Sequence, residues 1–367
     1  MKKLIDICDI QYGYAFDSKC FTDDSCYPPL VRIRDVKRGY SETYYSGDYP
    51  KEYVLASGDL LVGMDGEFNI ARWKCDGALL NQRVCKLIAK KGTNEEYLRF
   101  AMTKALKEIE RRTAFVTVKH LSAKELNKLQ LSVPDLSEQN RVAKILSRLE
   151  KVIDLRRQEL QKLDDLIKAR FVEMFGDPVD NPMGWNKKRL QDIVSDDCSI
   201  SYGIVQTGDD KEEGVPVFRP VDIVNRVPKL DELKKTTEEI SNKYKRTILK
   251  GREMLITVRA NIADTCIVGE EFKGCNVGRG IVPIRTKEDI MVLEFLKYLM
   301  DSKHLNDDIK RKAKGITLIQ LNMEDLREVE LIIPPVEQQK IFVDFAKKID
   351  KSKVAVLKKL FTRRCSI

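Results

Sequence analysis

Side chains that perform nucleophilic or metal-assisted catalysis are sparse in this sequence. It has two histidines, His120 and His304, and neither has a Ser or Cys partner in a recognisable motif. A zinc site needs closely spaced Cys and His residues, but the nine cysteines form no C-x-x-C pair. We therefore expect structural roles for both histidines, no metal site, and reduced thiols at positions 8, 20, 26, 75, 85, 198, 266, 275 and 365.

Motifs for nucleotide and phosphate chemistry are also missing. The string nearest to a phosphate-binding loop, GEEFKGC at residues 269–275, lacks the lysine that should follow its second glycine. The Gly-x-Gly at residues 278–280 stands alone and is better explained as a turn. A metal nuclease needs clustered carboxylates with a nearby lysine, and no acidic-x-Lys triplet follows Asp135 within thirty residues. The sequence thus predicts a chain that is not an enzyme by itself.

The net charge of +9 is concentrated in two segments. Residues 137–171 hold nine Lys/Arg against six Asp/Glu, and residues 337–364 hold nine against three, which accounts for the whole excess. A basic stripe of this kind suits a polyanion or acidic protein partners. The alternative is an ordinary solvated helix face.

The segments that would position these residues occur twice. Residues 113–136 read TAFVTVKHLSAKELNKLQLSVPDL and residues 313–336 read AKGITLIQLNMEDLREVELIIPPV. A Gln-rich stretch and a long amphipathic segment follow each copy, and an N-terminal echo aligns Tyr12 with Tyr202. A separation of 200 residues is too long for a solenoid and indicates a duplicated domain.

Each copy combines strands, turns and short helices. Residues 54–71 and 248–263 both predict a buried strand between two loops, and we expect Asn69 and Asn261 at matching places after it. EEYLRFAM and LEFLKYLM, at residues 95–102 and 293–300, predict short amphipathic helices.

A long helix is predicted after each module. The first begins after Pro134 with Ser137 as its N-cap, and only Arg156 interrupts its a/d heptad seam. Packing the two seams against each other buries both apolar stripes, in antiparallel orientation if the modules face opposite ways. The expected coiled-coil interface residues are Val142, Leu146, Leu149, Ile153, Leu160, Leu163, Ile167, Phe342, Phe345, Ile349, Val356 and Leu360.

The predicted fold class is α+β, with two similar mixed modules separated by two long helices that form an antiparallel coiled coil with pseudo-two-fold symmetry. No apolar run approaches the roughly 18–20 residues that cross a bilayer, and the N-terminus does not resemble a signal peptide, so we expect a cytoplasmic protein. The predicted boundaries are 1–136 for the first module, 137–173 for the first helix, 174–186 for a linker, 187–336 for the second module and 337–367 for the second helix.

These features resemble the specificity subunit of a Type I restriction–modification system. The resemblance rests on VPDLSEQNR and IPPVEQQKI after the modules, T-V-K-H-L and T-L-I-Q-L before them, the EMFGDP…NPMGW linker, and the order of the repeat. It covers essentially the whole chain. The second Gln-rich stretch departs from the first, with EQQ at residues 337–339 where the first has SEQ at 137–139.

The resemblance implies two target recognition domains, each reading one half of a bipartite duplex DNA site, with the helices as spacer. It also implies partners for DNA methylation and host defence: two methyltransferase (modification) subunits that use S-adenosylmethionine, and motor-nuclease (restriction) subunits. This chain itself would hold no cofactor. Its Pro334-Pro335 lies between Ile333 and Val336 and cannot serve as the [N/D]-P-P-[Y/F] motif of amino-methyltransferases. The alternative is a coiled-coil scaffold whose modules bind proteins rather than DNA.

Candidate DNA contacts are Arg, Lys, Asn and Gln side chains in the clusters between the repeated markers, because these donate to phosphates and base edges. Each could instead be an ordinary surface or ion-pair residue. The first module offers Arg34, Lys37, Asn69, Arg72, Gln82 and Arg83. The second offers Gln206, Arg219, Arg259, Asn261 and Arg279.

Overall fold

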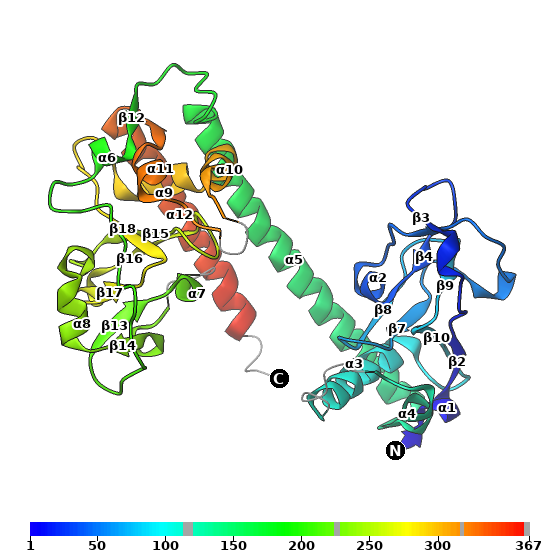
Figure 1. Ribbon diagram of the computed structural model, residues 1–367. Coiled ribbons are helices and arrows are strands. Elements are labelled where there is room, and N and C mark those ends of the chain that lie inside the picture. Colours follow the sequence, from blue (N-terminus) through cyan, green and yellow to red (C-terminus); the bar gives the residue numbers. More distant parts are fainter. Residues whose placement is uncertain (113–119, 224–227, 316–318, 363–367) are drawn as a thin grey trace. The chain divides into compact units, whose positions relative to one another are not determined.

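The computed structural model describes residues 1–112, 120–223, 228–315 and 319–362, with side chains up to residue 357 (Figure 1). The chain divides into two compact units, Met1–Leu155 and Arg156–Ile367, and the division falls inside one long helix. Among the described residues, no helix is long and apolar enough to span a membrane. Each unit contains one of the two predicted modules.

The first module is built on a four-stranded antiparallel sheet with the strand order β2-β10-β7-β8. The run LLVG forms the buried strand β7, as its apolar sequence predicts. The strands of this module are β1 (Lys2–Lys3), β2 (Cys8–Tyr12), β3 (Phe21–Thr22), β4 (Leu30–Val31), β5 (Tyr44–Tyr45), β6 (Val54–Leu55), β7 (Leu60–Gly63), β8 (Asn69–Arg72), β9 (Ala78–Leu80), β10 (Val84–Ala89) and β11 (Gln130–Leu131). Smaller sheets pair β4-β9-β6, β3-β5 and β1-β11.

Helix α3 packs on this sheet and closes its core. The helices of the first unit are α1 (Leu4–Ile7), α2 (Ile33–Arg38), α3 (Glu95–Arg112), α4 (Ala123–Lys128) and the start of α5 (Leu136–Phe175). Leu98 and Met102 of α3 are buried in one cluster with Leu60 and Leu87 of the sheet. The helix is longer than the predicted 95–102, because good helix formers continue without Gly or Pro and Leu106 extends the apolar face.

The second module repeats this plan. Strand β15 (Glu253–Thr257) lies at the centre of the antiparallel sheet β16-β15-β18 and is buried along its whole length. The other strands are β12 (Lys187–Arg189), β13 (Val215–Phe218), β14 (Lys234–Thr236), β16 (Thr265–Val268), β17 (Asn276–Val277), β18 (Ile281–Ile284) and β19 (Glu330–Ile332). They form the further sheets β14-β13-β17 and β12-β19.

The helices of the second unit bury an aromatic cluster. They are α6 (Leu190–Ile193), α7 (Pro220–Ile223), α8 (Glu238–Lys243), α9 (Leu293–Met300), α10 (Lys303–Lys312), α11 (Met323–Arg327), α12 (Val336–Thr362) and the end of α5. Phe175 of α5, Phe295 of α9 and Phe342 of α12 are buried, with ring centroids 4.8 to 6.1 Å apart. Helix α9 matches the predicted segment 293–300.

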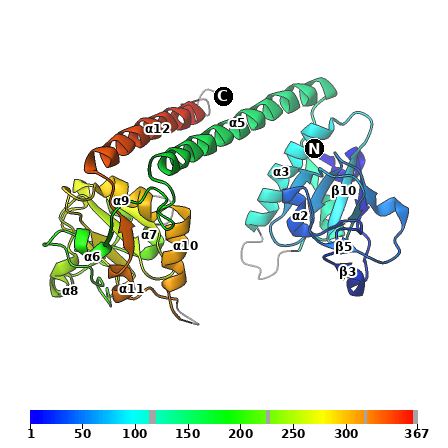
Figure 2. The ribbon, with the colours of Figure 1, turned by 90° about the horizontal axis from the view of Figure 1, so that it is seen from above.

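The long helices pair in antiparallel orientation within the second unit, as predicted (Figure 2). Phe171, near the end of α5, contacts Phe342, near the start of α12, with ring centroids 5.4 Å apart. Earlier on α5, Asp164 forms an ion pair at 2.5 Å with Lys353, which lies further along α12. Residue numbers therefore fall along one helix as they rise along the other.

The seam residues differ in burial. Ile167, Phe342 and Val356 are buried in the second unit. The partly buried seam residues are Leu160, Leu163, Phe345 and Ile349 in this unit, and Val142, Leu146, Leu149 and Ile153 in the first unit. The side chain of Leu360 lies outside the described residues. Arg156, which interrupts the seam, is partly buried and pairs with Glu159 one turn later.

Two local details at the ends of α5 differ from or refine the prediction. The helix starts at Leu136, and the Asp135 carboxylate, not Ser137, caps it by accepting a hydrogen bond from the Glu138 amide at 2.9 Å. An aspartate just before the first turn reaches this amide, whereas Ser137 already lies inside the helix. At the other end, Gly176 has a φ of +70° and its amide donates to Val172 O, which ends the helix.

Candidate nucleic-acid interface

The carboxyl end of the central strand has the same backbone frame in both modules. After β7, the amide of Leu121 donates to Met64 O at 2.7 Å, which places His120 beside Asp65. After β15, the amide of Leu321 donates to Val258 O at 3.0 Å, which places Gln320 beside Arg259. The repeated motifs T-V-K-H-L and T-L-I-Q-L supply these contacts, although residues 117–119 and 317–318 lie outside the described part of the chain.

A tight turn before the last strand of each sheet is also repeated. The amide of Gln82 donates to Tyr14 O at 2.8 Å, and the amide of Arg279 donates to Ile204 O at the same distance. Both side chains are exposed, so Gln82 and Arg279 occupy equivalent positions on the two modules.

Glycines make these turns possible. A Cβ on Gly13 would lie 2.0 Å from Asn81 O, and one on Gly203 would lie 2.0 Å from Val277 O. No side chain fits at such a distance from a carbonyl oxygen. The residue after each glycine bridges the turn, Tyr14 to Asn81 and Ile204 to Gly278, which confirms the correspondence of Tyr12-Gly13 with Tyr202-Gly203 predicted from the sequence echo.

A short helix adds a third element to each site. In each module, an aspartate in the first turn of the helix accepts a hydrogen bond from the backbone amide of the residue that precedes the helix. Asp35 accepts from Arg32 at 2.9 Å, and Asp222 accepts from Arg219 at 2.8 Å. Arg32 is exposed and is the structural equivalent of Arg219. The sequence prediction chose Arg34 and missed Arg32. Aligning the aspartates of VRIRD and FRPVD would have found it.

In the second module these elements bring arginines together. A Cβ on Gly280 would lie 2.5 Å from Pro220 Cγ and 3.3 Å from Arg259 Cβ, so the turn, the short helix and the end of β15 are in close contact. Arg259 Nε donates to Gln320 Oε1 at 2.7 Å. Arg219 directly precedes Pro220, and exposed Arg279 directly precedes Gly280. The result is a positively charged cluster at one end of the module.

In the first module the same positions carry a mixed charge. His120 Nδ1 contacts the Asp65 carboxylate, and Arg83 Nη1 lies 2.9 Å from His120 Nδ1 and 3.4 Å from Asp65 Oδ1. Arg83 stands where the second module has Gly280, and it has a φ of +71°. The two modules thus share a frame but present different groups from it.

Other predicted contact residues are already engaged within the first module. Arg72 donates to Glu96 at 2.5 Å and to Gly58 O at 2.7 Å, which ties its side chain toward α3. Exposed Lys37 pairs with Glu67 at 3.2 Å. Exposed Arg34 lies 3.4 Å from Thr43 Oγ1 and 3.8 Å from Asp35. In the second module, Gln206 is exposed.

The expectation that Asn69 and Asn261 match is wrong. Seven residues separate the paired Val62 and Ile70 in the first module, whereas eight separate the paired Ile256 and Thr265 in the second. The structural equivalent of Asn69 is therefore Asp264. Asn69 begins strand β8, whereas exposed Asn261 lies in the turn, with its backbone carbonyl held by Thr257.

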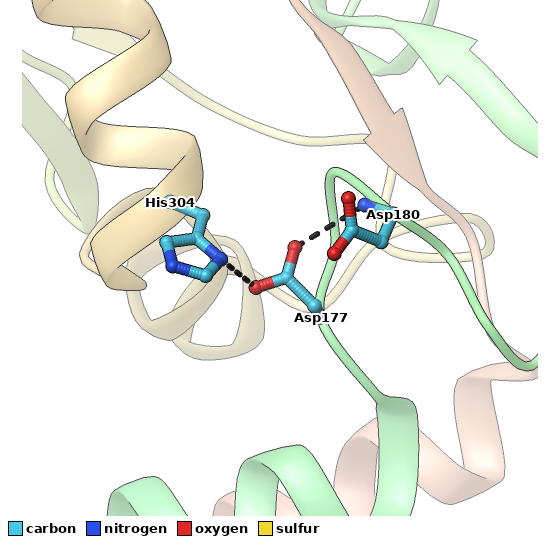
Figure 3. A group of neighbouring side chains, drawn as sticks. All are labelled: Asp177, Asp180 and His304. Atoms are coloured by element: carbon cyan, nitrogen blue, oxygen red, sulfur yellow. Dashed lines mark hydrogen bonds and ion pairs between the residues drawn. The ribbon is translucent and has the colours of Figure 1, made fainter.

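Asp177, Asp180 and His304 form a group with ligand-type side chains, within the part of the chain that the structure describes (Figure 3). The Asp177 carboxylate accepts the amides of Val179 at 2.9 Å and Asp180 at 3.2 Å, and it contacts His304. Burial raises the pKa of Asp177, but these hydrogen bonds together outweigh burial and lower it. They tie the loop after α5 to α10, and they account for the group without a metal ion.

Comparison with known proteins supports the resemblance. Residues 1–165 and 182–361 match the family described as Type I restriction modification DNA specificity domain. The Type I restriction enzyme EcoBI specificity subunit of Escherichia coli is 31% identical over 357 residues, covering 91% of this chain and 75% of that protein. The MjaVIII specificity subunit of Methanocaldococcus jannaschii is 21% identical over 356 residues, covering 88% and 82%.

Solved structures support the fold. The S subunit of a Type I restriction–modification system from M. genitalium aligns with a TM-score of 0.57 at 13% identity, covering 98% of this chain and 91% of that one. A chain from a structural study of complex assembly and conformational transition in the type I R-M system aligns with a TM-score of 0.55 at 20% identity, covering 100% and 93%. With a family match over both modules, this chain belongs to the family of Type I restriction–modification specificity subunits.

Proposed function

We propose that this chain is the DNA-recognition subunit of a Type I restriction–modification complex. Each module binds one half of a bipartite duplex site, and the chain positions methyltransferase and restriction subunits without catalysing either reaction alone. One observation carries the proposal: the two modules hold equivalent positions on one backbone frame but fill them with different side chains. Asp65 and Arg259 are such a pair, and Gln82 and Arg279 are another. Two modules that recognise different short DNA sequences need a common backbone frame and different side chains on it.

The chemistry of the clusters suits nucleic acid. Arginine binds phosphates and the guanine edge, and glutamine binds the adenine edge. Exposed Arg32, Gln82 and Arg83 lie on the repeated elements of the first module. In the second module, Arg259 and Arg279 lie on the same elements. A protein-binding scaffold would not need arginines collected at the matched strand end and turn, and the family match favours DNA.

The long helices suit a spacer and an assembly site. The 40 residues of α5 span about 60 Å at 1.5 Å per residue. That is on the order of 17 base pairs at 3.4 Å each. We propose that two modification subunits, which use S-adenosylmethionine, assemble on this chain in keeping with its two modules, and that restriction subunits join them.

The proposal is tested by purifying the chain alone and together with the modification subunits of the same system. The chain alone should neither methylate nor cleave DNA. The complex should bind duplex DNA with an affinity that falls steeply as salt rises, and methylome sequencing of cells carrying both should show one split motif. Methylation of DNA by the purified chain alone contradicts the proposal, and so does a complex that does not bind duplex DNA.

Exchange of one module sharpens the test. Replacing residues 187–336 with the same region of a relative should change one half of the methylated motif and leave the other half intact. The matched control replaces residues 1–136 and should change the opposite half. A change in both halves after a single exchange would show that the modules do not read independently.

A further inference from the structure

Arg259 and Asp65 occupy the same place on the two modules, and the groups that support them differ. We propose that Arg259 reads a guanine in the half-site of the second module and that Gln320 is the positioning residue that aims it. This inference rests on the proposed DNA-recognition function and assigns a base and a supporting residue within it.

The guanidinium of Arg259 is held by one edge. Its Nε donates to Gln320 Oε1 at 2.7 Å, and its Nη2 contacts the same oxygen. An arginine carries five N–H donors in a rigid fork. The remaining donors, on Nη1 and on the outer side of Nη2, contact no acceptor among the described residues. Two parallel donors of this kind match the O6 and N7 acceptors of guanine in the major groove.

Gln320 is itself fixed at both ends. Its Nε2 donates to the Tyr202 hydroxyl at 2.5 Å, which leaves Oε1 to accept from Arg259. Its backbone exchanges two hydrogen bonds with Lys314, at 2.9 and 3.0 Å. Tyr202 is partly buried against the main core of the second unit. A reading side chain whose support is locked in this way loses little conformational freedom on binding.

The neighbouring arginine on the short helix is held by the same edge of its guanidinium, but it does not differ between the modules. Arg219 donates through Nε at 3.0 Å and Nη2 at 2.8 Å to the carboxylate of Asp222. Its equivalent in the first module is Arg32, so this position carries an arginine in both modules and does not distinguish the two half-sites. Exposed Arg279 stands on the adjacent turn. Among the three arginines of the cluster, Arg259 is the one whose supporting side chain is itself held, by Tyr202, and whose position carries an acceptor, Asp65, in the first module.

The first module does not present a matching donor. At the position of Arg259 it has Asp65, whose carboxylate contacts His120 and Arg83. A carboxylate accepts hydrogen bonds and cannot bind the O6 and N7 acceptors of guanine. The two half-sites should therefore differ at the base that faces this position.

The test uses the full chain in complex with its modification subunits and a library of randomised duplexes. Arg259→Ala should lose the preference for one guanine in one half-site by about 5- to 150-fold, the range for a single bidentate contact, with other positions unchanged. Arg259→Lys, which keeps the charge but not the fork, should lose the same preference. The control is Arg252→Ala, an exposed arginine that precedes β15 at the strand's opposite end and pairs with Glu288 and Glu294.

Gln320 is tested separately. Gln320→Ala should weaken the same guanine preference without lowering the unfolding temperature by more than the Arg252→Ala control does. Gln320→Glu should restore the preference, because its carboxylate still accepts from the guanidinium. If the wild-type complex selects no sequence, the proposed function fails. If it selects a split site but Arg259→Ala keeps every guanine, the present inference alone is overturned. An unchanged preference in Gln320→Ala overturns the positioning role.

Discussion

Adding one methyl group to Gly13 or to Gly203 should disable one reading site at a time. A Cβ on Gly13 would meet Asn81 O at 2.0 Å and Val84 O at 2.9 Å. A Cβ on Gly203 would meet Val277 O at 2.0 Å and Gly278 O at 2.8 Å. Moving from 2.0 Å to an ordinary contact of 3.4 Å requires a shift of about 1.4 Å. The obstructing atoms are backbone carbonyls and cannot rotate away.

The displaced backbone carries the exposed residues of the turn. Gln82 directly follows Asn81, and Arg279 follows Val277 by two residues. Overpacking of this kind costs about 1–3 kcal/mol. Gly13→Ala should therefore destabilise the first module by that amount and weaken base preference in one half-site, and Gly203→Ala should do the same in the second module and the other half-site.

The measurements are thermal unfolding and selection of randomised duplexes by the complex with its modification subunits. Gly92→Ala is the control, because its Cβ would meet no atom within 4 Å, its cost comes only from a φ of +90°, and it follows β10 at the end away from Gln82 and Arg83. It should cost about 1–2 kcal/mol and leave both half-sites unchanged. The reasoning is refuted if Gly13→Ala disturbs both halves equally, or if neither glycine variant changes stability or selection.

Three further perturbations act on other parts of the chain. Four residues inserted in α5 after Leu155 add about 6 Å and rotate the following turn by roughly 40°, so methylome sequencing should show a gap wider by about two base pairs with the same bases read. Phe342→Ala, at a fully buried ring, should lower the free energy of unfolding by about 3–5 kcal/mol in denaturant titration. Burial raises the pKa of Glu96, but hydrogen bonds from Arg72 and Arg99 outweigh it and lower the pKa. This stabilisation is present above the pKa of an unfolded glutamate and lost as pH falls through the lowered value, so Glu96→Gln should flatten the pH dependence of unfolding below about pH 5.

The backbone frame of each module was predictable, because buried strands and close backbone contacts require apolar runs and glycines that are visible in short stretches of the sequence. The strand LLVG and its counterpart at residues 253–257 read as buried strands, and both are. The glycines after Tyr12 and Tyr202 mark a close approach that no other residue permits. The apolar heptads similarly predicted that the long helices pair, because a stripe of that length must be covered.

The side-chain partners were not predictable, because they come from distant parts of the chain. From the sequence alone, Arg72 is a candidate base contact. In the structure its side chain donates to Glu95 at 3.4 Å and to Glu96 at 2.5 Å, and these partners lie 23 and 24 residues further along the chain. A one-residue difference in the turn after the central strand misaligned Asn261. Gln320 went unnoticed, although the 200-residue offset that aligns it with His120 is visible in the sequence.

The division between frame and reading group has a physical basis. Backbone hydrogen bonds, such as Leu121 to Met64 O and Leu321 to Val258 O, bring the strand end and the downstream segment together. These bonds do not depend on which side chain follows, so Asp65 and Arg259 can differ in charge while the fold persists. A substitution at either position then changes a hydrogen-bonding pattern and its local supports, without disturbing the core beneath. For this reason we expect changes at residues 65 and 259 to alter selection more than stability, and changes at the glycines of the turns to alter both.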